Sequence, residues 1–261
     1  MGEIMKVAIF DSGVGGLTVL RTAMQQMPDI EYFYYADLDN VPYGNKDKEM
    51  VNKLTFHAAD QIIDMGVDAI VLACNTATSI SADLLRKRYD LPIIGMEPAV
   101  KPAVMNSSGK RVLVLATELT IKESKLKNLI DRLEASDKVD LMPMSELVDL
   151  AEEMDFEGDR VQSLLKKKFN GIDLSVYKTV VLGCTHFIYY RKIIEKHFNY
   201  LIDVIDGNLG TVNHLERTLI GLGYKKERGK SKKSVKYYVS GKRVASSTFE
   251  GYMAYLEKHN I

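Results

Sequence analysis

Residues 71–76 read VLACNT and residues 181–186 read VLGCTH, so an apolar run ending in a small residue, a cysteine and two polar residues occurs twice. A second pair precedes the first in each half of the chain: residues 6–12 read KVAIFDS and residues 111–117 read RVLVLAT. Two matches in the same order, at nearly the same offset, indicate an internal duplication. The chain is therefore predicted to contain two similar α/β units.

Short apolar runs alternate with amphipathic segments around these motifs. The runs are rich in Val, Ile and Leu and show little polar alternation, as strands buried on both faces do. Strands are expected at residues 7–10, 32–36, 69–72, 92–95, 111–116, 139–142, 179–182 and 201–205. Apolar residues recur at helical spacing between them, at Leu17, Leu20, Met24 and Met27 and at Met50, Leu54, Ala58 and Met65. This alternation predicts βαβ units, with mostly parallel sheets flanked by helices.

Proline, glycine and small polar residues cluster at residues 97–109, where we place the domain boundary. The segment after Asp206 is too short for a third domain and is expected to return to the first. We therefore expect a first domain of residues 1–98 plus 207–261, carrying Cys74, and a second of residues 99–206, carrying Cys184.

The composition of the 261 residues excludes several classes of protein. Lys plus Arg and Asp plus Glu are 35 each, so the chain lacks the basic balance expected of a nucleic-acid-binding protein. No apolar run reaches the length of a membrane span, and the first residues do not resemble a secretory signal, so we expect a cytoplasmic protein. The basic run Lys225–Lys236 is interpreted as an exposed loop before a strand at 236–240, with a phosphate or polymer contact as the alternative. The acidic stretch 146–159 is interpreted mainly as a solvated helix face.

The two cysteines, Cys74 and Cys184, each follow a buried strand and open an expected helix. Ligands of open parallel sheets bind at the carboxyl ends of the strands, and a helix N-terminus there lowers the pKa of a thiol. The chain lacks a C-x-x-C redox pair and the Cys-x5-Arg of thiol phosphatases, and it lacks the closely spaced ligands of a structural zinc site. A cysteine hydrolase would leave one thiol unexplained. Both thiols are therefore predicted to be working groups, with His186 as a proton partner beside Cys184.

The segment DSGVGGLT at residues 11–18 resembles a dinucleotide-binding loop imperfectly, because Thr18 stands where the third glycine belongs. Asp37 at the end of the second strand keeps a nucleotide-binding protein using Gly13–Gly16 as an alternative. Asp11 would repel a pyrophosphate, however, and suits an ammonium ligand or a neighbouring thiol better. The glycines would then permit close approach of the backbone, and the turn Pro42-Tyr43-Gly44 would close over a small ligand.

These motifs together resemble those of the bacterial glutamate racemase family over essentially the whole chain. The matching segments are DSGVGGLTV at 11–19, PYG at 42–44, ACNTA at 73–77, AT with a further Thr at 116–120, and GCTHF at 183–187. The resemblance implies two pseudo-symmetric domains with the active site in the cleft between them. It also implies a homodimer that acts on a small molecule, without cofactor or metal, and supplies D-glutamate for peptidoglycan.

The resemblance also assigns roles to residues. The catalytic group would comprise Cys74, Cys184, Asp11, His186 and Glu152. Substrate would be held by Asp11, Ser12, Pro42, Tyr43, Gly44, Asn75, Thr76, Thr117, Thr120, Thr185 and His186. Two positions depart from the family pattern: Ile188 and Asp149 stand where the family often has proline.

The implied reaction uses one base on each face of the substrate, with Cys74 acting on D-glutamate and Cys184 on L-glutamate. The alternatives within the superfamily are an aspartate or hydantoin racemase and a decarboxylase, which needs only one thiol. A non-catalytic regulator that keeps the fold is a further alternative.

Overall fold

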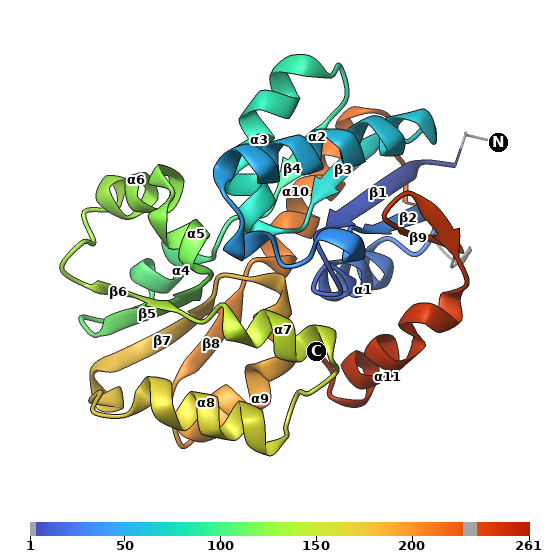
Figure 1. Ribbon diagram of the computed structural model, residues 1–261. Helices are drawn as coiled ribbons and strands as arrows, with labels where there is room; N and C mark the ends of the chain where they lie inside the picture. The colour runs from blue at the N-terminus through green and yellow to red at the C-terminus, as the bar shows by residue number, and fades with distance from the viewer. Residues whose placement is uncertain (1–3, 227–233) are drawn as a thin grey trace.

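The computed structural model describes residues 4–226 and 234–261 and contains two sheets (Figure 1). The larger sheet has the strand order β10-β9-β2-β1-β3-β4. Its strands are β1 (Lys6–Asp11), β2 (Glu31–Ala36), β3 (Ala69–Leu72), β4 (Ile93–Gly95), β9 (Ser234–Val239) and β10 (Lys242–Val244). All neighbours in this sheet are parallel except the antiparallel pair β9–β10.

The smaller sheet has the order β6-β5-β7-β8, and all its strands are parallel. Its strands are β5 (Arg111–Ala116), β6 (Val139–Pro143), β7 (Tyr177–Leu182) and β8 (Asp203–Asp206). The eight strands expected from the apolar runs are all present, within two residues at either end, and the predicted α/β class is confirmed.

The two sheets repeat one arrangement, since β2-β1-β3-β4 corresponds strand for strand to β6-β5-β7-β8. The correspondence extends to single hydrogen bonds. The N–H of Ala73 donates to the carbonyl of Phe10 at 2.8 Å, and the N–H of Gly183 donates to that of Leu115 at 2.7 Å. The residue before each cysteine is thus tied to the central strand of its own sheet, and both thiols emerge at equivalent strand ends.

Helices flank both sheets (Figure 1). The α-helices are α1 (Leu17–Gln26), α2 (Lys48–Asp64), α3 (Asn75–Arg88), α4 (Val100–Met105), α5 (Glu118–Lys122), α6 (Ser124–Arg132), α7 (Glu146–Glu152), α8 (Asp159–Phe169), α9 (Arg191–His197), α10 (Asn208–Gly221) and α11 (Glu250–Lys258). Short 3-10 turns include η2 (Tyr43–Asn45) and η4 (Thr185–Tyr190). No helix in residues 4–226 and 234–261 is long and apolar enough to cross a membrane.

The buried face of α2 coincides only in part with the predicted one. Met50 is 43% exposed, whereas the residues turned into the core are Val51, Thr55, Ala58, Ala59 and Ile62. Of the predicted positions, Ala58 is buried, and Leu54 and Met65 are partly buried against the same core, so the predicted stripe lies along one edge of the buried face. In α1 the predicted positions Leu17 and Leu20 are fully buried.

The chain after β8 returns to the larger sheet. Helix α10 packs on α1, where Gln26 donates to Asn213 at 2.9 Å, and β9 extends the sheet beside β2. Helix α11 then lies against α1 and against the end of α7 (Figure 1). Residues 227–233 of the predicted basic loop lie outside the described residues, and the strand expected at 236–240 is present as β9.

Candidate active site

The two thiols lie between the sheets, at the carboxyl ends of β3 and β7. Cys74 is the N-cap of α3, and Cys184 precedes η4. The two side chains are 6% and 7% exposed. Each belongs to a different sheet, so the space between them is bounded by both halves of the chain.

Cys74 is surrounded by hydrogen-bonding groups and by a buried carboxyl. Its Sγ accepts the N–H of Ala77 at 3.4 Å and lies 3.6 Å from the hydroxyl of Ser12. Burial raises the pKa of Cys74 to about 12, and the charge of Asp11 adds to the effect. The expectation that the helix N-terminus lowers the pKa is therefore wrong for this thiol, because desolvation outweighs the N–H groups of α3.

Asp11 connects the two halves of the site. Its carboxylate is fully buried and accepts the N–H of Gly13 at 2.9 Å and the hydroxyl of Thr185 at 3.0 Å. Burial raises the pKa of Asp11 to about 6, against the opposing effect of His186. The carboxyl that ends β1 thus touches the residue that follows Cys184.

Cys184 has an imidazole as its partner. Nδ1 of His186 lies 3.7 Å from Sγ of Cys184, and Nε2 lies 2.7 Å from Oε1 of Glu152. Burial alone would lower the pKa of His186, but its hydrogen bonds to Cys184 and Glu152 raise that pKa well above its usual value. Thiol, imidazole and carboxylate form a continuous relay that can hold or move a proton.

Glu152 is not part of a solvated helix face, as the acidic composition of 146–159 led us to expect. It is the last residue of α7, and its side chain is only 17% exposed. Its Oε1 also accepts the N–H of Val14 at 2.8 Å. Leu147, Val148 and Ala151 of the same helix are buried in the core. Their packing fixes the orientation of α7 and directs the side chain of Glu152 toward the site.

The glycine loop after β1 packs against this relay. A Cβ on Gly13 would lie 1.9 Å from Oε1 of Glu152, and one on Gly15 would lie 2.7 Å from the backbone nitrogen of His186. The expected close approach of the backbone is confirmed. The space that would hold a pyrophosphate is filled by Thr185 and His186, so the geometry disfavours the nucleotide-binding alternative.

The far side of the site is formed by hydroxyl groups from both halves. Oγ1 of Thr76 lies 3.1 Å from that of Thr117 and 3.2 Å from that of Thr120. Gly44 closes over them, since a Cβ there would lie 2.8 Å from Cβ of Thr117. This cluster offers donors for a second polar group of a substrate.

The turn 42–44 is held in place by the carboxylate of Asp37. Half-buried Pro42 precedes η2 and follows a cis peptide bond. Tyr43 is buried, and its hydroxyl donates to Oδ2 of Asp37 at 2.7 Å. The hydroxyl of Ser240, in the β9–β10 turn, donates to Oδ1 of the same carboxylate at 2.9 Å. Asp37, which we had weighed only as a nucleotide ligand, holds this turn.

Asn75 follows Cys74 and carries an unused acceptor. Its amide nitrogen donates to the carbonyl of Met96 at 3.5 Å, while its Oδ1 has no partner in the part of the chain that the structure describes. The side chain is 3% exposed. A buried acceptor of this kind suits an ammonium or N–H donor on a substrate.

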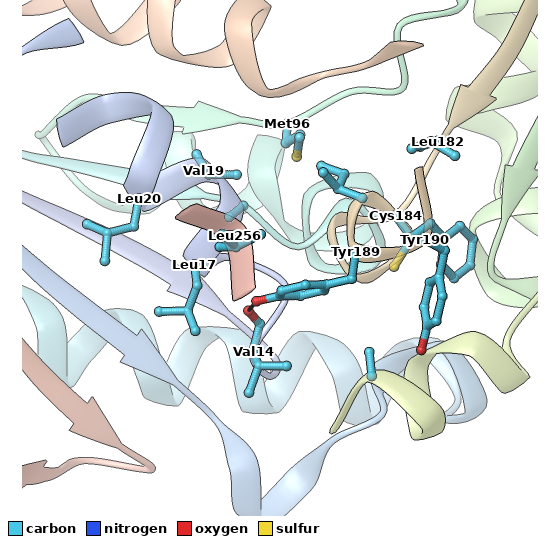
Figure 2. Packing of buried hydrophobic residues seen from close by; sticks show 14 of the residues in the cluster. Val14, Leu17, Val19, Leu20, Met96, Leu182, Cys184, Tyr189, Tyr190 and Leu256 are labelled. Carbon is cyan, nitrogen blue, oxygen red and sulfur yellow. Dashed lines mark hydrogen bonds between the residues drawn. The ribbon is translucent and has the colours of Figure 1, made fainter. Parts of the chain in front are cut away.

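Two contributors to the site were not predicted. Val14 donates its N–H to Glu152, and its carbonyl accepts the hydroxyl of Tyr189 at 2.9 Å. Figure 2 shows Tyr189 extending toward Val14 beside Cys184 and Tyr190. The partners lie 175 residues apart, and a main-chain group carries no side-chain signal in the sequence.

No group of three or more His, Cys, Asp or Glu residues able to hold a metal is found within 4–226 and 234–261. A cavity of about 1310 Å³ lies elsewhere, between β4, the end of β8 and the start of α10, and neither thiol lines it. Both thiols are nearly buried, with 6% of Cys74 and 7% of Cys184 exposed.

Comparison with known proteins identifies the family to which this chain belongs. The profile described as "Asp/Glu/Hydantoin racemase" matches residues 17–215. The chain belongs to this racemase family. It is 49% identical to the glutamate racemase of Halothermothrix orenii over 92% of the chain and 94% of the relative. It is 47% identical to that of Lachnospira eligens over 97% of the chain and 96% of the relative.

A solved structure agrees with the sequence comparison. The glutamate racemase of Escherichia coli, in complex with L-glutamate and the activator UDP-MurNAc-Ala, superposes with a TM-score of 0.79 at 26% identity. The match covers 98% of this chain and 95% of that one. The expectation of an amino-acid racemase with two α/β halves is confirmed.

Proposed function

We propose that this racemase interconverts L- and D-glutamate by transferring the Cα proton between the substrate and the two thiols, Cys74 and Cys184. The observation that carries the proposal is their placement at equivalent strand ends of two facing sheets. Racemisation needs a base on one face of Cα and an acid on the other, and this geometry supplies both without movement of either group.

The proton inventory of one turnover balances. With L-glutamate, the thiolate of Cys184 takes the Cα proton, and the electron pair of the broken C–H bond spreads into the α-carboxylate. The thiol of Cys74 then gives its proton to the opposite face, leaving a thiolate there. With D-glutamate the roles exchange. His186 and Glu152 form a hydrogen-bonded pair beside Cys184. Beside Cys74 lie the hydroxyl of Ser12 and the carboxyl of Asp11, whose charge raises the pKa of the Cys74 thiol.

The substrate contacts follow from the donors and acceptors described above. The unused Oδ1 of Asn75 and the carboxylate of Asp11 suit the substrate ammonium. The hydroxyls of Thr76, Thr117 and Thr120 suit a carboxylate, and stabilising the charge that develops on the α-carboxylate lowers the barrier. Thr185, Pro42, Tyr43 and Gly44 complete the enclosure.

We propose glutamate rather than aspartate as the substrate, because the relatives named above are glutamate racemases. The proposal includes a homodimer in the cytoplasm that supplies D-glutamate for peptidoglycan. Its domains are residues 1–98 plus 207–261 and residues 99–206, a division supported by the sheet membership of every strand.

The test is incubation with L-glutamate in deuterated water, without added cofactor, following optical rotation and deuterium at Cα. Loss of rotation with deuterium entry supports the proposal. Exchange with aspartate but not glutamate would retain the mechanism and change the substrate. No exchange with either amino acid, in a protein shown to be folded, would overturn it.

A further inference from the structure

We propose that Tyr252, in the C-terminal helix α11, is a positioning residue that holds Glu152 in register with His186 and so supports proton transfer at Cys184. The inference rests on the proposed racemisation and adds a residue from an element that contributes no reacting group.

The contact is direct and well placed. The hydroxyl of Tyr252 donates to the backbone carbonyl of Glu152 at 2.6 Å, and Tyr252 is 9% exposed. Glu152 is the last residue of α7, where carbonyl groups have no partner within the helix. The carbonyls of Asp149, Leu150 and Ala151 accept N–H groups from residues 153–155, but no such backbone bond reaches the carbonyl of Glu152 among the described residues. Tyr252 supplies the missing partner from another part of the chain.

An aromatic cluster fixes Tyr252 and the end of α7 to each other. Phe156, four residues beyond Glu152, stacks on Tyr189 with ring centroids 4.6 Å apart and lies 4.3 Å from Tyr255 of α11. The Tyr252 ring meets Phe156 edge-on at 6.1 Å. Helix α11 therefore packs as a brace against the segment that carries Glu152, rather than touching it at a single point.

The same cluster leads back to the glycine loop. The hydroxyl of Tyr189 holds the carbonyl of Val14, and the N–H of Val14 donates to Oε1 of Glu152, the oxygen that also pairs with Nε2 of His186. One carboxylate oxygen thus serves two donors 2.8 and 2.7 Å away. Such a shared geometry tolerates little displacement, so an anchor on the Glu152 backbone bears directly on the relay.

Tyr252→Phe removes only the hydroxyl and tests this role. We expect kcat to fall about 3- to 10-fold, the loss that follows from about 1 kcal/mol of hydrogen-bond energy. The primary isotope effect with Cα-deuterated L-glutamate should rise, because abstraction by Cys184 becomes more rate-limiting. With Cα-deuterated D-glutamate it should fall, because reprotonation by Cys184 then limits the rate. Loss of folded protein alone would change neither isotope effect.

A double-mutant cycle with Glu152→Gln provides the second readout. If Tyr252 acts through Glu152, Tyr252→Phe costs little in the Glu152→Gln background. The matched control is Tyr32→Phe, which removes a buried hydroxyl that donates to the main-chain carbonyls of Ala23 and Met27, both at 2.9 Å. This control should leave both isotope effects at their wild-type values.

Two outcomes separate this inference from the proposed function. A wild-type protein without racemase activity defeats the proposed function. An active wild-type protein in which Tyr252→Phe leaves the isotope effects unchanged, or lowers kcat equally with and without Glu152→Gln, overturns the role of Tyr252 alone.

Discussion

The regions around Cys74 and Cys184 have the same backbone and different chemistry. In both, the residue before the thiol donates to the central strand of its sheet. Around Cys74, however, the neighbours are the Ser12 hydroxyl and the buried Asp11 carboxyl, whereas Cys184 has the His186–Glu152 pair. The duplication therefore preserved the position of each base, while the groups that govern its ionisation diverged.

This divergence has a thermodynamic limit. Two enantiomers have equal free energies, so kcat/KM must be equal in the two directions whatever surrounds each thiol. The different partners of Cys74 and Cys184 can make kcat differ between the two enantiomers, but KM must then differ by the same factor. Variants that affect one face alone are the means to test the comparison.

The largest effect is expected on removal of either thiol. Cys74→Ala and Cys184→Ala should each lower kcat by about 10³-fold or more, since each removes the acid or base of one face. Polarimetry with both enantiomers measures this. If one of the two variants kept a tenth of the activity, the two faces would not be equivalent and a single base would suffice.

The next effect compares the partners of the thiols. His186→Asn should lower kcat by about 10²-fold, because it removes the only imidazole of the relay. Ser12→Ala should cost about 10-fold or less, because it removes one neutral hydroxyl beside Cys74. Steady-state kinetics at saturating glutamate decide the order. Equal losses would mean that the imidazole gives Cys184 no advantage over a hydroxyl.

The buried carboxyl gives a pH-dependent effect on stability. The pKa of Asp11 is about 6 in the native protein and 3.8 in its unperturbed state. Between these values the native state holds a proton that the unfolded chain has released. The contribution of Asp11 to the unfolding free energy therefore falls as the pH rises from about 4 to about 6, by up to about 3 kcal/mol.

Asp11→Asn should remove that decline, as measured by urea denaturation at pH 4.5 and pH 7. Asp140→Asn is the control of opposite sign, since Arg111 holds the pKa of Asp140 below its usual value and that ion pair stabilises the fold above it. An unchanged pH profile in Asp11→Asn would contradict the burial of a charged group there.

The smallest effect is a difference in reactivity between the thiols. Iodoacetamide should modify Cys184 about 10-fold faster than Cys74 at pH 8, because the raised pKa of Cys74 leaves little thiolate. Peptide mass spectrometry after brief labelling measures both rates. In urea the two rates should converge. Faster labelling of Cys74 in the folded protein would reverse the comparison.

Most of the fold could be predicted from local sequence patterns. Runs such as 111–116 identify strands because a strand buried on both faces can contain little else. The echo of 71–76 in 181–186 predicted the equivalent positions of the thiols. The prediction for α2 missed Thr55 and Ala59 because they carry a weak apolar signal, and it wrongly included Met50, which is 43% exposed.

The site was less predictable than the fold, because its decisive contacts are long-range. Glu152 meets Val14 across 138 residues and Tyr252 across 100. Nothing local distinguishes a glutamate on a solvated face from one at a relay, so only the family resemblance indicated Glu152. The direction of the pKa shift of Cys74 was mispredicted for another reason. A helix N-terminus can be recognised in the sequence, but the degree to which the thiol is desolvated cannot.

The return of the chain to the larger sheet has a consequence for synthesis on the ribosome. The smaller sheet is complete once Asp206 has left the exit tunnel, because β5 to β8 are contiguous in the chain. The larger sheet begins with Lys6 yet lacks its neighbour for β2 until Val239 emerges. The half that is translated first is therefore finished last, and the nascent chain must keep the edge of β2 unpaired while the later half folds.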